Sequence, residues 1–113
     1  MTDEMIALAR RAVACRGWRW IPGMKLTTGL RLTESLVWLT YPVDLPDLTD
    51  PATLGCLLAL VREAWGDDEA YAIPWHDEDG GWTVCVHEED RSVSVSEGDT
   101  ETEALVAALE LAP

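Results

Sequence analysis

The sequence predicts an α+β domain in which three helices cover an antiparallel sheet, in the order α-βββ-α-βββ-α. In three segments, apolar residues recur three and four positions apart, as on one face of a helix. Six shorter segments, separated by turn-forming residues, have the composition of strands. Because the chain has 113 residues and no stretch typical of a linker, we expect residues 1–113 to form a single domain with one core.

The first helix is expected over Thr2–Arg16. Thr2 suits the N-cap, acidic residues follow in the first turn, and Gly17 suits the position after the last turn. Three short strands should come next. The third is apolar on both faces, so it should lie at the centre of the sheet. The strands are expected at Met24–Leu26, Leu30–Thr33 and Leu36–Tyr41.

The clearest helix start is at Asp50 and Pro51. Aspartate suits the N-cap, and proline suits the first helical position because its missing N–H needs no partner there. Gly66 is expected to end this helix. An apolar stripe at helical spacing should face the core. The stripe consists of Leu54, Leu57, Leu58, Val61 and Trp65.

Three further strands are predicted to form an antiparallel meander, at Tyr71–Trp75, Trp82–His87 and Ser92–Ser96. Thr100 and Glu103 have the spacing of a capping box, so the last helix should start there. Its inner face is expected to consist of Ala104, Leu105, Ala108, Leu109 and Ala112.

The most distinctive local feature is Trp18-Arg19-Trp20. On an extended chain the two indoles share one face. One interpretation makes them core anchors, since the chain has no Phe. The other makes them a stacking platform for a base or a partner, with Arg19 adding cation–π attraction. We favour the core.

Charge is distributed unevenly along the chain. The net charge is −13, yet the first 31 residues hold six of the eight basic side chains and only two acids. The overall charge argues against direct binding to nucleic acid or to an anionic membrane. The asymmetry indicates an interaction surface, or else a basic third that neutralises acids within the same domain.

Acidic residues concentrate in the turns of the second half of the chain. We expect them to lie close together and form one negative surface that binds a partner. The alternative is that they serve ordinary solubility. The expected partner-binding residues are Asp77, Glu78, Asp79, Glu88, Glu89, Asp90, Glu97 and Asp99.

No catalytic motif stands out, and we expect no enzyme activity, cofactor or metal. A calcium loop near residue 77 fails because Gly81 occupies the third ligand position. Cys85 and His87 share a strand face and His76 could approach them, but a fourth zinc ligand is missing. Thiol chemistry at Cys85 and His87 lacks a Gly-rich nucleophile turn.

Compartment signals point to the cytoplasm. Three cysteines without a CxxC pair favour a reducing environment. The longest apolar run, Cys56–Val61, is too short to span a bilayer, and Arg10 and Arg11 interrupt any signal peptide. A soluble cytoplasmic protein is expected, with homodimer formation through a free sheet edge as a further expectation.

Two segments carry a family resemblance. Residues 11–24, which include GWRWIPGM, and residues 45–61, LPDLTDPATLGCLLALV, resemble short bacteriophage and prophage proteins that have no assigned activity. Residues 102–109 are similar to the last helix of many such proteins. The resemblance implies a phage origin and carries over no functional residues.

Small acidic phage proteins include inhibitors of host CRISPR systems, some of which imitate DNA. By this analogy the chain is expected to be a non-enzymatic inhibitor whose acidic face binds a nucleic-acid-binding defence complex of the host. The alternative is a phage accessory or assembly protein that binds another phage protein through apolar surface.

Overall fold

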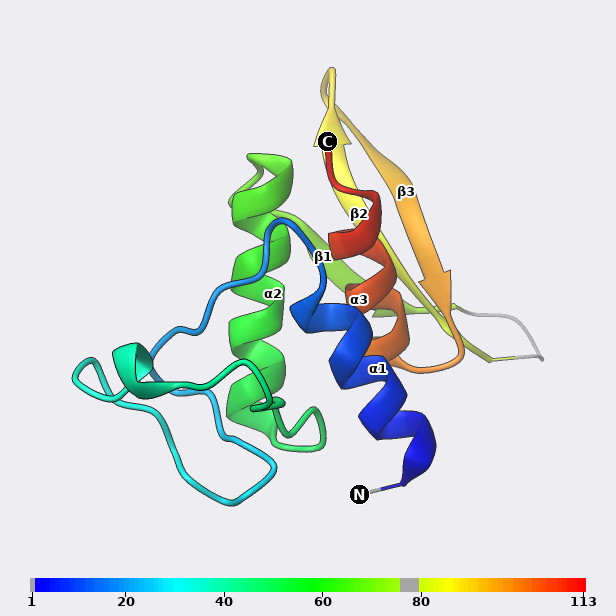
Figure 1. The fold of residues 1–113 in the computed structure, drawn as a ribbon. Helices are drawn as coiled ribbons and strands as arrows, with labels where there is room; N and C mark the ends of the chain where they lie inside the picture. Colours follow the sequence, from blue (N-terminus) through cyan, green and yellow to red (C-terminus); the bar gives the residue numbers. More distant parts are fainter. Residues whose placement is uncertain (1, 76–79) are drawn as a thin grey trace.

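The computed structural model describes residues 2–75 and 80–113 (Figure 1). Within these residues the chain forms three α-helices, one 3-10 helix and a three-stranded antiparallel sheet, so the predicted α+β class is confirmed. The elements are α1 (Asp3–Val13), η1 (Val37–Leu39), α2 (Pro51–Trp65), β1 (Tyr71–Pro74), β2 (Trp82–Glu88), β3 (Arg91–Gly98) and α3 (Glu101–Leu111).

Helix α3 lies at the centre of the fold. It packs on one face of the sheet, most extensively against β3, while α1 and α2 pack on its other sides (Figure 1). Its sequence suits this position, because a helix that is apolar almost all round is a buried one. The sheet, α3, and the pair α1 and α2 therefore form successive layers. The buried apolar residues of α3 are Ala104, Leu105, Val106, Ala108 and Leu109.

The predicted meander is confirmed, with strand order β1-β2-β3 and antiparallel neighbours. Val84 of β2 pairs with Ser96 of β3 and is fully buried. The next pair, Cys85 with Ser94, skips Val95, so β3 carries a bulge there. Because of the bulge, Val95 packs against the core and the Ser96 hydroxyl still donates to a carbonyl oxygen of α3 at 2.7 Å.

Both predicted ends of α2 are confirmed. The Asp50 carboxylate accepts from the Thr53 N–H at 2.9 Å, Pro51 starts the helix, and Gly66 ends it with a φ of 64°. The predicted stripe faces the core. Leu57 and Val61 are buried, and the other three residues are half-buried, namely Leu54, Leu58 and Trp65.

The other two helices begin as predicted, but α1 is shorter than expected. It starts after Thr2 and ends at Val13 instead of Arg16. The Cys15 N–H donates to the Ala12 carbonyl three residues back, at 3.1 Å, which tightens the turn beyond the helix. Helix α3 starts after Thr100, whose hydroxyl accepts from the Glu103 N–H at 3.1 Å.

The three strands predicted between α1 and α2 are wrong. Residues 18–50 form a long irregular segment that contains only the 3-10 helix and two isolated bridges. One bridge joins Lys25 to Arg31 and the other joins Leu26 to Pro46. The order of α-helices and strands is therefore α-α-βββ-α, and the sheet has one block of strands.

The expected central strand, Leu36–Tyr41, fails because its backbone groups bond locally. The Leu39 N–H donates to the Leu36 carbonyl at 3.0 Å, as in a 3-10 helix. A strand that is apolar on both faces needs a neighbour on each side, and the short runs before it supply none. Trp38 is consequently 86 % exposed.

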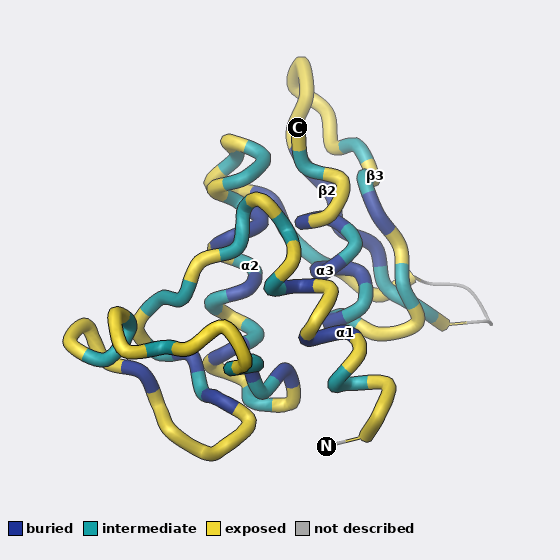
Figure 2. The backbone as a smooth tube through the Cα atoms, viewed as in Figure 1, coloured by how far each residue is buried: buried dark blue, intermediate teal, exposed yellow. Residues whose placement is uncertain are grey.

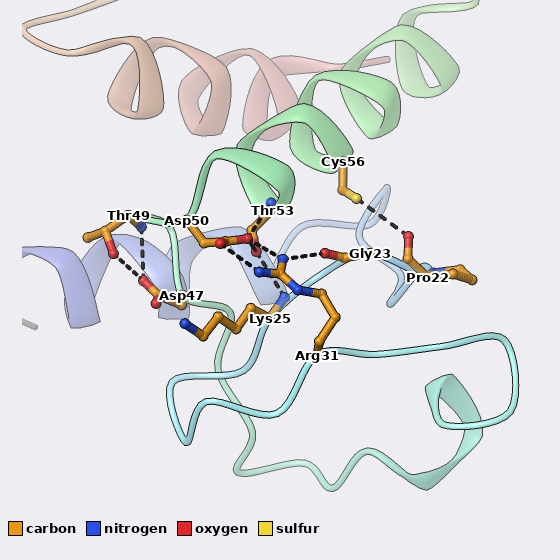
Figure 3. Close-up of polar contacts among 9 residues, drawn as sticks. All are labelled: Pro22, Gly23, Lys25, Arg31, Asp47, Thr49, Asp50, Thr53 and Cys56. Atoms are coloured by element: carbon orange, nitrogen blue, oxygen red, sulfur yellow. Dashed lines mark hydrogen bonds and ion pairs between the residues drawn. The ribbon is translucent and has the colours of Figure 1, made fainter.

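The irregular segment is fastened to the start of α2. The Arg31 guanidinium forms a bidentate ion pair with Asp50 and donates to the Gly23 carbonyl at 2.9 Å (Figure 3). The Lys25 N–H donates to the Thr53 hydroxyl, also at 2.9 Å. Four apolar side chains of the segment complete the attachment by entering the core. They are Met24, Leu26, Leu32 and Leu48.

Candidate functional site

The β2–β3 hairpin ends in three consecutive acids, Glu88, Glu89 and Asp90, which we call the hairpin acids. All three are exposed, and none forms an ion pair with another described residue. Glu89 and Asp90 have φ values of 48° and 66°, the left-handed conformation of a tight hairpin turn. The turn thus carries charge at positions where uncharged glycine or asparagine fits the backbone as well or better.

Further acids lie near this hairpin, on the loop between α2 and β1. The Asp67 carboxylate accepts from the His87 N–H at 2.7 Å and contacts the ring Nδ1 at 3.2 Å. Backbone hydrogen bonds from His87 and Glu69 lower the pKa of Asp67, so it is charged at neutral pH. With the neighbouring Asp68 and Glu69, the loop adds negative charge at this end of the sheet.

A second acidic group lies where β3 leads into α3. Glu97 and Asp99, which we call the strand-end acids, are both exposed. Nearby, the Glu103 carboxylate accepts from the Asp99 N–H at 3.0 Å. A groove of about 570 Å³ opens beside these residues, with α1 as its other wall and Met5 and Leu8 among its lining. It therefore combines apolar walls with charged residues among which acids outnumber the single base, Arg11.

The two acidic groups stand at opposite ends of β3, roughly 20 Å apart at the usual rise of a strand. Successive turns of a meander fall at alternate ends of the sheet, so those expected residues that the structure describes do not share one patch. Asp77, Glu78 and Asp79 lie outside the described residues. The structure brings together Glu88, Glu89 and Asp90 at one end, and Glu97 and Asp99 at the other.

Much of the basic N-terminal charge is neutralised inside the domain. Three of the six basic side chains in the first 31 residues form ion pairs with acids from later in the sequence. For these three, the structure supports the interpretation that the basic third neutralises acids within the same domain. Within the described ranges, Arg10, Arg16 and Lys25 form none. The pairs are Arg11–Glu110, Arg19–Glu63 and Arg31–Asp50.

The irregular segment exposes large apolar side chains. Trp38, Leu39, Tyr41 and Val43, which we call the apolar loop patch, are all more than half exposed. Figure 2 shows this segment as largely exposed, at the lower left of the view. Single exposed apolar residues are ordinary, but four within six positions are typical of an interaction surface. Sequence reasoning missed this surface because it placed most of these residues in a central strand.

The tryptophans of Trp18-Arg19-Trp20 pack against the core, as the favoured interpretation predicts, and they also border an apolar groove. Their rings contact edge to face with centroids 5.2 Å apart, and both are half-buried against the core. They also line an apolar groove of about 500 Å³, together with Pro22, Val37 and Trp38. The apolar loop patch therefore continues into a hollow walled by indoles.

Cys85 and His87 lie two residues apart on β2, but their surroundings differ. Cys85 is buried, whereas His87 is exposed and its ring is held beside Asp67. Among residues 2–75 and 80–113, no group of three or more His, Cys, Asp or Glu side chains is arranged to hold a metal ion. His76, the third ligand considered, lies outside the described residues.

Comparisons with known proteins add no relative: no family model, no curated protein and no solved structure matches the chain. In the part of the chain that the structure describes, no helix is long and apolar enough to cross a membrane. A functional proposal therefore depends on the surfaces described above.

Proposed function

We propose that the protein is a phage-encoded, non-enzymatic inhibitor of a host defence system, and that its acidic residues bind a basic, nucleic-acid-binding surface of a defence complex. A CRISPR effector complex is the class of target. The observation that carries this proposal is the pair of exposed acidic groups at the two ends of β3, which form no ion pair within the described residues. The phage origin rests on the resemblance of residues 11–24 and 45–61.

The lack of internal partners makes these acids suited to binding. Arg11, Arg19 and Arg31 already hold acids elsewhere in the domain, whereas the hairpin acids and strand-end acids form no ion pair within the described residues. Free carboxylates attract a basic groove over long distances and speed association at low salt. Such a surface competes with nucleic acid for the same basic groove.

The surroundings of Cys85 and His87 favour binding over catalysis. Burial of Cys85 removes its thiol from solvent, and the His87 ring faces Asp67. Among the described residues, no hydrogen bond joins a nucleophile to this histidine. The proposal therefore includes no catalytic residue, cofactor or metal, and it places the protein in the cytoplasm of the bacterial host.

A plaque assay in a CRISPR-defended host tests this function. The host carries an active CRISPR system against the challenging phage and expresses the protein from a plasmid. We expect plaque formation to be restored. The double variant Glu88→Gln/Glu97→Gln, which removes one charge from each acidic group, should restore it less. The control Asp3→Asn/Glu34→Gln removes two charges elsewhere and should behave like the original protein. Full immunity in the presence of the protein would contradict the proposal.

The apolar loop patch favours a second candidate function. A phage accessory or assembly protein would use such a surface to bind another phage protein, and apolar contacts of this kind depend little on salt. Capture of phage proteins from infected cells, unchanged between low and moderate salt and lost in Trp38→Ser/Tyr41→Ser, would support this candidate over the inhibitor.

A further inference from the structure

Strand β3 leaves one edge of the sheet open. It pairs with β2 on one side, and within the described residues no strand pairs with its other side. Helix α3 covers one face of β3 but not this edge (Figure 1). Alternate residues of an edge strand direct N–H and C=O groups away from the sheet, where another strand can bond to them.

The side chains of β3 differ between its two faces. Val93 and Val95 are half-buried, and Val95 packs against the core beneath α3. Ser92 and Ser94 are exposed. An added strand would therefore continue the sheet best if its apolar residues alternate with small polar residues. Its apolar side chains would then lie beside Val93 and Val95, and its polar side chains beside Ser92 and Ser94.

Charge selects which strand can be added. The hairpin acids precede β3 and the strand-end acids close it, with Arg91 as the one basic residue over residues 88–99. A second copy that pairs antiparallel through its own β3 would set the hairpin acids of each copy against the strand-end acids of the other, and like charges directly opposite each other repel. A partner segment with basic residues at both of its ends would instead place positive charge beside the hairpin acids and beside the strand-end acids.

We propose that the open edge of β3 binds an extended basic segment of the partner protein as a fourth strand, with the hairpin acids at one end and the strand-end acids at the other. This inference rests on the proposed function, in which the acidic residues bind a basic surface of a partner protein. It adds that the part of the partner bound here is an extended segment. Main-chain hydrogen bonds to β3 supply affinity, and the acids at each end select for basic sequence.

The groove at the α3 end suits one long basic side chain. Met5 and Leu8 offer apolar contact for an alkyl stem, and Glu97 and Asp99 line the same groove. Arg11 also lines it, but its guanidinium is already paired with Glu110. Lysine and arginine bury their stems in this way while their charged heads stay near water or a carboxylate. The partner segment should therefore place a lysine or arginine where it passes the end of β3.

A synthetic peptide tests the edge directly. The probe has two lysines at each end and five alternating valine and serine residues between them. Titrated against the ¹⁵N-labelled protein, it should bind saturably and protect from hydrogen exchange those amides of Ser92–Glu97 that face away from β2. The same peptide with its five central amides N-methylated keeps all charges but cannot donate hydrogen bonds from those five main-chain nitrogens. Because several main-chain hydrogen bonds are lost, it should bind at least about tenfold more weakly.

Matched protein variants test the charge. Glu88→Gln/Glu97→Gln should weaken binding of the unmodified peptide, whereas Asp3→Asn/Glu34→Gln should not. Equal binding of the two peptides, or binding without protection of β3 amides, would overturn the inference, and so would no measurable binding. If the peptide binds as expected but the protein fails to restore plaque formation, the edge site stands and the proposed function fails.

Discussion

Arg31 and Asp50 form a bidentate ion pair that fastens the irregular segment of residues 18–50 to the first turn of α2. The same carboxylate caps the helix by accepting from the Thr53 N–H at 2.9 Å. One aspartate therefore both starts α2 and fixes the segment that carries the apolar loop patch. This contact, together with the four apolar side chains of the segment that enter the core, holds the patch in its position on the domain.

Asp50→Asn should lower the free energy of unfolding in a pH-dependent way. The hydrogen bond from Arg31 holds the pKa of Asp50 well below its ordinary 3.8, so ionisation stabilises the fold. This contribution is fully present at neutral pH and declines as the pH falls through and below 3.8. Urea unfolding should show a gap between the two proteins at pH 7 that narrows at about pH 2.5. Identical midpoints at pH 7 would show that the pair does not stabilise the fold.

Gly98→Ala should destabilise the protein by about 2 kcal/mol through overpacking. A Cβ at this position would lie 2.7 Å from the Ala104 nitrogen and 2.7 Å from the Glu103 Cβ, so β3 and α3 would have to separate. Gly55→Ala is the control, because nothing lies within 4 Å of its added Cβ and alanine favours a helix. Thermal unfolding should show Tm falling for the first variant and rising for the second. An unchanged Tm for Gly98→Ala would contradict the close packing at this joint.

Glu88→Gln/Glu97→Gln should leave the free energy of unfolding within about 0.5 kcal/mol of its original value. Both side chains are exposed and form no ion pair within the described residues, so folding does not depend on their charge. Chemical unfolding measures this, and a large loss of stability would mean that the acids have a structural role. Fluorescence anisotropy of the labelled basic peptide should then show weaker binding and a shallower dependence on salt.

Trp38→Ser/Tyr41→Ser should also leave stability within about 0.5 kcal/mol, because both side chains are more than two-thirds exposed. The variant should stay longer in solution at high concentration, since an exposed apolar patch promotes association. Light scattering over a concentration series measures this. Loss of the folded state in this variant would show that the patch is structural.

The second half of the fold could be predicted because its signals are local. Asp50, Pro51 and Gly66 mark the ends of α2 through chemistry within one turn of chain. The strands of the meander follow one another through short turns, so each finds its partner next in sequence. The prediction of three strands between α1 and α2 is wrong because it assumes that the apolar residues of Leu36–Tyr41 are buried. Burial of such a run depends on residues far away in the sequence, and the spacing of apolar residues within the run carries no information about them.

The candidate site was predicted in composition but not in arrangement. The sequence identifies the exposed acids around Glu88 and Glu97, because charged residues in turns stay in solvent. Their grouping depends on which turns share an end of the sheet, and here the two sets lie at opposite ends of β3.

The most direct measurement is affinity capture of the tagged protein from nuclease-treated lysate of the phage host, read by mass spectrometry at low and moderate salt. The inhibitor proposal predicts recovery of a nucleic-acid-binding defence complex that diminishes as salt rises and is reduced for Glu88→Gln/Glu97→Gln. Recovery of phage proteins alone, independent of salt and of these two acids, would contradict it and favour an accessory role through the apolar loop patch.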